Sequence, residues 1–387
     1  MNVLSAYCRK MKIPISWLKR SSLILFLCCF FLISARIFPQ IEFQTLSDRV
    51  ISPAGTKGAR PDALYFDGKF YVAYLQISPV RTFRLIALDK DLMLTGTTDL
   101  YSGEDEPTDI RICTDGIKFL YCAFETTGFK RDVPNHLNIA RYEFTRSLPV
   151  LVDSKTEVAA AMPVVIPDGL PKPGDNLVDD PAPFAYRGYY YAITRKWESA
   201  ILEIHRFSSD LQRMKTYNLD VGKSFPGLHL SVNSLVEIDG KPYLVSGVSN
   251  GPPIDQRFFS YIEAIGFDES MTRVAGKPVV LSKTGKYEDY VACAKYSGGM
   301  LFVGYDKREF HSPEAGLSDH AGMIKVFNPK NGFREIGSIQ VNSGRMIDNH
   351  FTFEIADGKL CVFYQTPDEE IRGSVIAFKS VNTSDPR

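Results

Sequence analysis

Long helical periodicity, a cysteine framework and an excess of either charge are all missing from this chain of 387 residues. Because apolar residues do not recur every three or four positions, the pattern weighs against an α/β enzyme fold. The 45 basic and 45 acidic residues cancel, and no basic run interleaved with aromatics follows residue 40. Nucleic acid is therefore not expected as a partner. A hydrophobic content of 44% still allows a sizeable core.

The seven cysteines do not form a disulfide pattern. Four of them sit singly in apolar, strand-like runs, where cysteine acts as a small buried hydrophobe: Cys113, Cys122, Cys293 and Cys361. A tight turn at Asp115-Gly116 would set Cys113 opposite Lys118 rather than Cys122. No Cys/His spacing indicates zinc.

The first forty residues differ from the rest. Basic residues precede an apolar run of eleven, LILFLCCFFLI (23–33), which is the layout of a secretory signal. That run is short for a spanning helix, which needs about 20 residues. We therefore expect residues 1–38 to be an export signal that is either cleaved or kept as a signal anchor. The rest of the chain would be secreted, periplasmic or lumenal, and would meet a membrane only through this segment.

What the chain does contain is a repeat: six short strands run into a Gly-centred turn and return as aromatic-rich strands. The six hairpins are 63–74, 110–124, 183–193, 235–247, 292–305 and 353–364. Their turn glycines lie 48, 72, 52, 58 and 60 residues apart. One hairpin per about 45–60 residues is typical of a β-propeller, in which each hairpin forms the inner half of a four-stranded blade.

We therefore predict an all-β fold, a single six-bladed β-propeller over 41–380 with a short tail at 381–387. A five-bladed ring is the alternative. The sixth unit runs out after its third strand, and 41–51 (IEFQTLSDRVI) can supply the missing outer strand. That strand closes the ring and removes an exposed edge. The longer spacing between the second and third turn glycines is assigned to a Pro/Gly-rich insertion at 162–178. The protein is expected to be a monomer.

The inner strands of a propeller begin at one mouth of the central channel, so the residues at their starts converge. Five of the six predicted inner strands have a carboxylate there, and the fourth has a histidine and an asparagine. The residues are Arg60 with Asp62, Asp109, Asp180, His229 with Asn233, Glu288 with Asp289, and Asp348 with His350. A solvated polar rim would also show such residues, but their repetition favours a functional mouth.

The loops after the second strands reach the same face. Trp197, one of only two tryptophans, follows Arg195 there and could stack on a sugar ring or act as a hydrophobic lid. The acids of the mouth could also hold a structural Ca²⁺ at the channel, although no loop has a calcium-ligand spacing. No other cofactor and no metal site are expected.

Acids around an aromatic-flanked mouth suit glycoside chemistry. One carboxylic acid protonates the leaving oxygen, and a second activates water or attacks carbon, at about 5–5.5 Å separation for retention and about 6.5–9.5 Å for inversion. The four candidates for these roles are Asp62, Asp109, Asp180 and Glu288.

Residues 179–193 read DDPAPFAYRGYYYAI. This stretch resembles the strand-start motif of the arabinanase and β-xylosidase type (family 43-like) glycoside hydrolases: Asp-Pro, a short apolar stretch, then Gly-Tyr-Tyr. The resemblance implies an Asp general base, a second Asp that orients and tunes it, and a Glu general acid from another blade. Asp180 matches the motif directly, Asp62 and Asp109 occupy analogous places, and Glu288 is the best-placed acid. That family has five blades, and its motif opens the first of them rather than the third.

A sialidase-like arginine cluster is a further alternative. Arg60 with Arg111, Arg257 or Arg345 could grip a carboxylate bidentately, but the repeat Ser-x-Asp-x-Gly-x-x-x-Trp is absent from every blade turn. The sequence thus predicts an exported carbohydrate-active propeller, a glycoside hydrolase whose partner is a carbohydrate or glycoconjugate. The alternative is a non-catalytic propeller that binds a glycan or a protein.

Overall fold

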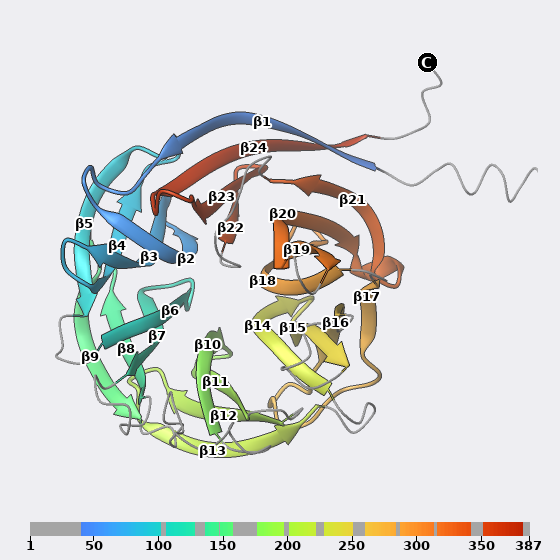
Figure 1. The fold of residues 1–387 in the computed structure, drawn as a ribbon. Coiled ribbons are helices and arrows are strands. Elements are labelled where there is room, and N and C mark those ends of the chain that lie inside the picture. Colours follow the sequence, from blue (N-terminus) through green and yellow to red (C-terminus); the bar gives the residue numbers. More distant parts are fainter. Residues whose placement is uncertain are drawn as a thin grey trace, which may run out of the picture. The chain divides into compact units, whose positions relative to one another are not determined.

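Each predicted hairpin is the inner half of a four-stranded antiparallel sheet, and six such sheets follow one another around a ring in the computed structural model (Figure 1). The ring belongs to the compact unit Phe43–Phe378. The second unit, Met1–Glu42 with Lys379–Arg387, is described only at 40–42 and 379–381. The structure describes residues 40–101, 106–127, 136–146, 148–157, 176–196, 201–221, 228–250, 260–283, 287–312, 316–341 and 351–381. The six-bladed all-β prediction is confirmed.

The blades are numbered in the chain order of their inner strands. The strands of each blade are given from the central channel outwards. Blade 1 contains β2 (Lys57–Phe66), β3 (Lys69–Ser78), β4 (Thr82–Leu88) and β5 (Leu94–Tyr101). Blade 2 contains β6 (Glu106–Thr114), β7 (Phe119–Thr127), β8 (His136–Glu143) and β9 (Val150–Glu157). Blade 3 contains β10 (Asn176–Tyr186), β11 (Tyr189–Lys196), β12 (Ile201–Ser208) and β13 (Arg213–Asp220).

Blades 4 to 6 repeat this order. Blade 4 contains β14 (Leu228–Ile238), β15 (Lys241–Asn250), β16 (Ser260–Gly266) and β17 (Val279–Lys283). Blade 5 contains β18 (Tyr287–Ser297), β19 (Met300–Ser312), β20 (Gly316–Asn328) and β21 (Arg334–Gln340), with a 3-10 turn η1 (Pro329–Asn331) before β21. Blade 6 contains β22 (Phe351–Ala356), β23 (Lys359–Gln365), β24 (Ile371–Val381) and β1 (Gln40–Val50).

The predicted export segment and most of the 162–178 insertion lie outside the described residues. Among the residues that are described, no helix has the length and apolar character to cross a membrane.

The turn glycines have a physical reason. In blade 1, Asp67 and Gly68 both have positive φ, 48° and 78°, which is the two-residue turn whose twist matches that of the flanking strands. Blade 2 differs, because the Asp115 carboxylate accepts three backbone N–H groups, from Ile117, Lys118 and Phe119. The wider turn puts Cys113 opposite Tyr121, so the predicted pairing of Cys113 with Lys118 is wrong.

Apolar side chains from neighbouring blades form the core. Between blades 2 and 3, for example, the rings of Tyr121 and Tyr190 stack with centroids 4.8 Å apart. The turn between the third and fourth strands of blade 3 adds one more buried side chain to this packing. Leu211 is fully buried in the same cluster although its φ is +58°. A left-handed leucine costs about 1–2 kcal/mol, and burying its side chain contributes about 1.5–3 kcal/mol, so the burial can offset the strained backbone.

A buried side chain at positive φ recurs in the equivalent turns of blades 1 and 4. There Leu92 and Met271 have φ of +59° and +56° and are 2% and 0% exposed. Each packs against the preceding blade: Leu92 against blade 6 and Met271 against blade 3.

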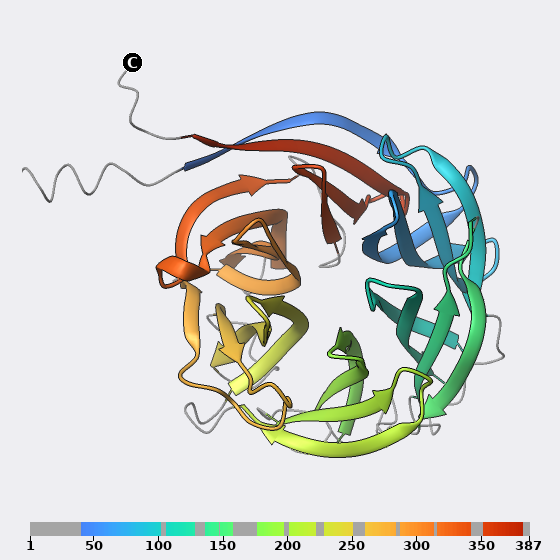
Figure 2. The same cartoon turned by 180° about the vertical axis from the view of Figure 1, so that it is seen from behind.

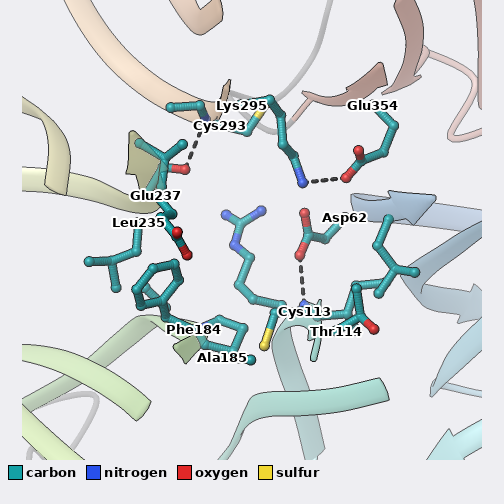
Figure 3. A pocket seen from close by; sticks show the side chains of 18 of the residues that line it. Asp62, Cys113, Thr114, Phe184, Ala185, Leu235, Glu237, Cys293, Lys295 and Glu354 are labelled. Carbon is teal, nitrogen blue, oxygen red and sulfur yellow. Dashed lines mark hydrogen bonds and ion pairs between the residues drawn. The ribbon is translucent and has the colours of Figure 1, made fainter. Parts of the chain in front are cut away.

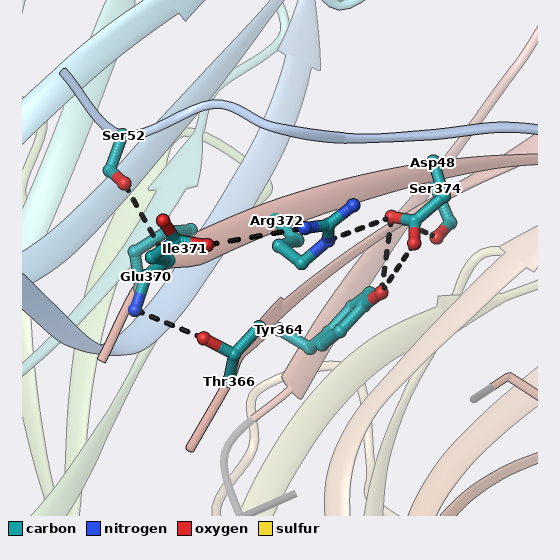
Figure 4. Close-up of polar contacts among 8 residues, drawn as sticks. All are labelled: Asp48, Ser52, Tyr364, Thr366, Glu370, Ile371, Arg372 and Ser374. Atoms are coloured by element: carbon teal, nitrogen blue, oxygen red, sulfur yellow. Dashed lines mark hydrogen bonds and ion pairs between the residues drawn. The ribbon is translucent and has the colours of Figure 1, made fainter. Parts of the chain in front are cut away.

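The ring closes through blade 6, where β1 pairs with β24, as both views show (Figures 1 and 2). This confirms the prediction that the N-terminal strand completes the last blade. The Asp48 carboxylate on β1 accepts hydrogen bonds from Tyr364 Oη (3.1 Å), Ser374 Oγ (3.1 Å) and Arg372 Nε (3.4 Å) (Figure 4). One acidic residue thus joins the closing strand to two strands from the other end of the chain.

Candidate functional site

A cavity of about 420 Å³ occupies the central channel, and every one of the six inner strands contributes to its wall. Five of the wall residues lie at one level of the channel, because each pairs with the equivalent residue of the second strand in its own blade. They are Asp62, Arg111, Ala182, Ser234 and Cys293. From this level the cavity extends towards the hairpin turns, as far as Thr114, Glu237 and Ser297. Figure 3 shows the labelled side chains of its wall.

Asp62, a predicted catalytic residue, lies in this cavity and also links three blades. Its Oδ2 accepts the backbone N–H of Ile112 in blade 2 at 2.7 Å, and its Oδ1 accepts the Thr352 hydroxyl of blade 6 at 3.2 Å. The residue is 9% exposed. Asp62 therefore holds the inner strands of blades 6, 1 and 2 together, whatever else it does.

The role of Asp62 as a link has a counterpart across the ring. Ser234 stands at the same level in blade 4, and its Oγ accepts the backbone N–H of Ala294 in blade 5 at 2.8 Å. The side chain at this level is thus used repeatedly to bond the next blade.

Lys295 and Glu354 form an ion pair that sequence reasoning missed. They come from blades 5 and 6, and the Lys295 ammonium also lies 3.4 Å from the carbonyl oxygen of Ala63 in blade 1. Burial alone would lower the pKa of Lys295, but the carboxylates of Glu354 and Asp62 outweigh burial and raise that pKa above its ordinary value. Burial raises the pKa of Glu354, and Lys295 offsets part of the rise.

Asp109 and Arg60, both predicted site residues, lie together at the contact between blades 1 and 2. The Asp109 side chain is fully buried, with Arg60 Nη1 3.6 Å and Arg111 Nη2 4.0 Å from its Oδ2. Arg60 has a φ of +53° at a register shift in β2 and donates to the carbonyl oxygen of Thr108. The buried carboxylate thus holds two guanidinium groups near the channel.

The other predicted site residues are placed only by their strands. Asp180 lies on β10, Arg195 on β11, Glu288 and Asp289 on β18, and His229 and Asn233 on β14. Trp197, Asp348 and His350 lie outside the described residues. The roles assigned to all of these side chains remain predictions.

A signal for Lys295 and Glu354 was present in the sequence. Both interrupt inner strands that are otherwise apolar, ACAKYS (292–297) and FEIA (353–356). A charged residue at a buried strand position needs a partner, and two such residues of opposite sign on neighbouring blades could have been paired.

No metal site is evident in the described part of the chain: there, no three His, Cys, Asp or Glu residues are grouped so that they could hold an ion. Its four cysteines are free thiols.

The ring of six four-stranded sheets around a central channel makes this protein a six-bladed β-propeller. A scan against models of known protein families gives no match, and neither does a search of curated protein sequences. Solved structures do match. An α-L-arabinanase from Penicillium chrysogenum, complexed with arabinobiose, has a TM-score of 0.60 at 12% identity, covering 89% of this chain and 100% of that one.

An α-L-arabinofuranosidase from Fusarium graminearum, a mutant in complex with an iminosugar inhibitor, has a TM-score of 0.60 at 11% identity and covers 87% of this chain and 98% of its own. A protein of unknown function from Dyadobacter fermentans has a TM-score of 0.59 at 13% identity, covering 87% and 99%. At these identities the likeness establishes the fold. The loose resemblance of 179–193 to arabinanase-type propellers is therefore accompanied by a shared fold.

Proposed function

We propose that this protein is an exported carbohydrate-active β-propeller that hydrolyses glycosidic bonds at the strand-start end of its channel. The observation that carries this proposal is that the inner strands of blades 1, 2, 3 and 5 each bear an acidic residue at the level of Asp62 or on the strand-start side of that level. These are Asp62, Asp109, Asp180 and Glu288. Acids that converge from different blades are what a two-carboxylate mechanism needs.

Two of these four acids are buried, and this separates residues that position the site from residues that act on the substrate. Asp109 is enclosed with Arg60 and Arg111, and both oxygens of Asp62 accept hydrogen bonds from the protein. Both therefore suit positioning: Asp109 fixes the two guanidinium groups, and Asp62 fixes the inner strands of blades 6 and 2 against its own. Asp180, which carries the Asp-Pro motif, is the proposed general base, and Glu288 is the proposed general acid. A sugar ring would stack on Trp197, and the remaining polar residues of the mouth would bind its hydroxyl groups.

The same burial also favours a second function, a propeller that binds a glycan or a protein without cleaving it. In that case the acids near the strand starts serve the fold and the recognition of the ligand, and no pair of them reaches a scissile bond.

The test compares wild type with Asp180→Asn and Glu288→Gln on a glycan array and on a panel of chromogenic glycosides, arabinosides and xylosides included. Hydrolysis is expected in wild type and a loss of at least 100-fold in kcat in both variants, because general acid–base groups contribute about 10²–10⁴-fold. Asp153→Asn, a substitution on the outer strand β9, should leave activity unchanged. Binding without turnover, insensitive to both substitutions, would support the non-catalytic function instead.

Export is proposed to depend on residues 1–38, in line with their cationic and apolar composition. Amino-terminal sequencing of the protein recovered from the exporting compartment tests this. A new amino terminus near residue 36 indicates a cleaved signal, the intact terminus in a membrane fraction indicates an anchor, and full-length protein in the cytosol contradicts export.

A further inference from the structure

The channel cavity lies in the half of the channel nearest the hairpin turns and is built like a ligand site of its own. It begins at the level of Asp62 and leads away from the strand starts, where the proposed hydrolytic residues lie. It ends beside the exposed side chain of Glu237 and the half-buried Ser297. At about 420 Å³ the cavity is within the size range of small-molecule sites, about 300–1,000 Å³.

Five charged side chains, each from a different blade, line the cavity: Asp62, Arg111, Lys295 and Glu354 in its inner part, and the exposed Glu237 at its turn end. The formal charges of the four inner groups sum to zero, two positive and two negative. An ion entering this cavity would lose its hydration without gaining a net opposite charge, which is costly. The exposed carboxylate of Glu237 further disfavours an anion. The site therefore suits an uncharged ligand.

The same groups offer hydrogen bonds of both kinds. An ammonium group has three donors, and Lys295 directs two of them, to Glu354 and to the carbonyl oxygen of Ala63. The carboxylates of Asp62 and Glu354 are acceptors beside it, and Figure 3 shows these three side chains pointing towards one another. Donors and acceptors set side by side match neighbouring hydroxyl groups, each of which gives and accepts a hydrogen bond.

The opposite part of the wall is mostly apolar, although Ser234 and Glu237 of blade 4 also line it. Phe184 of blade 3 and Leu235 of blade 4 face the charged side chains across the channel (Figure 3). A pyranose or furanose ring has the same two-sided character, with hydroxyl groups along its edge and C–H groups on its face. Aromatic and aliphatic side chains cover such a face, and the few polar groups fix its orientation.

From this arrangement we propose that the hairpin-turn half of the channel binds a neutral sugar, a monosaccharide or one end of a disaccharide. Its hydroxyl groups bond Lys295, Glu354 and Asp62, and its apolar face packs against Phe184 and Leu235. This site goes beyond the proposed hydrolysis and does not depend on it, because it lies at the other end of the channel and shares with the hydrolytic site only Asp62, which is proposed to position strands there rather than to act on the substrate.

The experiment measures binding by saturation-transfer-difference NMR and isothermal titration calorimetry. The probes are L-arabinose, D-xylose, D-galactose, D-glucose and their disaccharides, with glucuronate and glucosamine as charged counterparts. At least one neutral probe should bind at least 10-fold more tightly than either charged one. Lys295→Met/Glu354→Leu, which removes both charges together, should weaken that binding at least 10-fold.

Ser297→Trp tests the same site without altering the buried charges, because its side chain narrows the channel at the hairpin turns. It should also abolish binding, while the matched control Ser338→Trp on the outer strand β21 should not. Melting temperatures of all variants separate loss of binding from loss of fold. Asp180→Asn should bind the neutral sugar like wild type, even if it abolishes hydrolysis.

Three results would overturn the proposal. One is the absence of binding by every neutral probe, or equal binding by the charged ones. Another is unchanged binding in a folded Ser297→Trp or Lys295→Met/Glu354→Leu protein. The third is loss of binding in Asp180→Asn, which would place the sugar at the strand-start end. Failure of the hydrolysis proposal is recognised separately, as absence of turnover in wild type.

Discussion

The carboxylate of Asp62 accepts the backbone N–H of Ile112 over 2.7 Å and so bonds blade 1 to blade 2 at the wall of the channel. Its other oxygen bonds Thr352 of blade 6. Replacing Asp62 with alanine would leave a buried N–H and a buried hydroxyl without this partner, and each such group costs about 1–3 kcal/mol. We expect Asp62→Ala to lose about 2–4 kcal/mol of unfolding free energy in urea.

Thr352→Val is the matched comparison, because it removes the hydroxyl and leaves the Ile112 bond in place. It should cost about 1 kcal/mol. Equal losses in the two variants would show that the link to blade 2 contributes nothing.

The Lys295–Glu354 pair predicts a large effect of removing one partner and a small effect of removing both. Lys295→Met leaves Glu354 buried beside an apolar chain, which typically costs about 3–5 kcal/mol, whereas replacing a whole buried pair with apolar residues is often neutral. Lys295→Met/Glu354→Leu should therefore be more stable than Lys295→Met. A double-mutant cycle in guanidinium chloride at pH 7 measures this coupling, and additive losses would refute it.

The same single variant should acquire a characteristic pH dependence. Burial raises the pKa of Glu354, and replacing Lys295 removes the main group that offsets that rise. Above its ordinary pKa the carboxyl group then keeps its proton in the folded protein but loses it in the unfolded chain, so stability falls as pH rises. We expect Lys295→Met to lose stability relative to wild type as the pH rises above 4.5, the ordinary pKa of the carboxyl group. Lys295→Met/Glu354→Leu, which has no such carboxyl, should show no added slope.

Tyr74 makes a prediction for alkaline solution. Its side chain is fully buried at the contact of blades 1 and 6, and burial raises its pKa to about 12. Between pH 10 and 12 the unfolded chain loses this proton while the folded protein keeps it, so stability declines by up to about 1.4 kcal/mol per pH unit. Tyr74→Phe should reduce the slope by one proton over that interval. An unchanged slope would mean that the phenol titrates normally.

The closing strand predicts where the ring is weakest. Asp48→Ala removes the acceptor for Tyr364, Arg372 and Ser374. The arginine is partly exposed, so its share is small, and the two hydroxyl bonds contribute about 0.5–1.5 kcal/mol each. We expect a loss of about 2 kcal/mol and faster proteolytic cleavage around β1. Asp153→Asn is the control, and cleavage at the same rate in both would contradict a role in closure.

The fold was almost wholly predictable, because its determinants are local. Asp67-Gly68 and its equivalents require positive φ, which glycine allows, and each marks one hairpin and hence one blade. The missing fourth strand of the last unit also pointed to 41–51. The turn at Asp115 was mispredicted because a carboxylate there bonds three amides, a detail that residue type alone does not show.

The site was predictable only in part, because its contacts join residues far apart in the chain. Asp62 was found because it directly precedes the predicted hairpin at 63–74, although β2 begins earlier, at Lys57. Its bonds to Ile112 and Thr352 span 50 and 290 residues. Lys295 meets Glu354 from the next blade, and its strand β18 has a register shift between Val291 and Cys293, just before Lys295. Such register shifts are not visible in an apolar pattern that merely alternates.

The pairing of β1 with β24 has a consequence for the order of assembly. A ribosome releases β1 first, yet its partner strand comes some 320 residues later, so the last blade cannot form until the chain is nearly complete. Until then Leu46 and Val50 have no sheet to join. The growing chain therefore exposes an unpaired strand until it is nearly complete, and the charged residues of that strand, Glu42, Asp48 and Arg49, oppose its pairing with another copy.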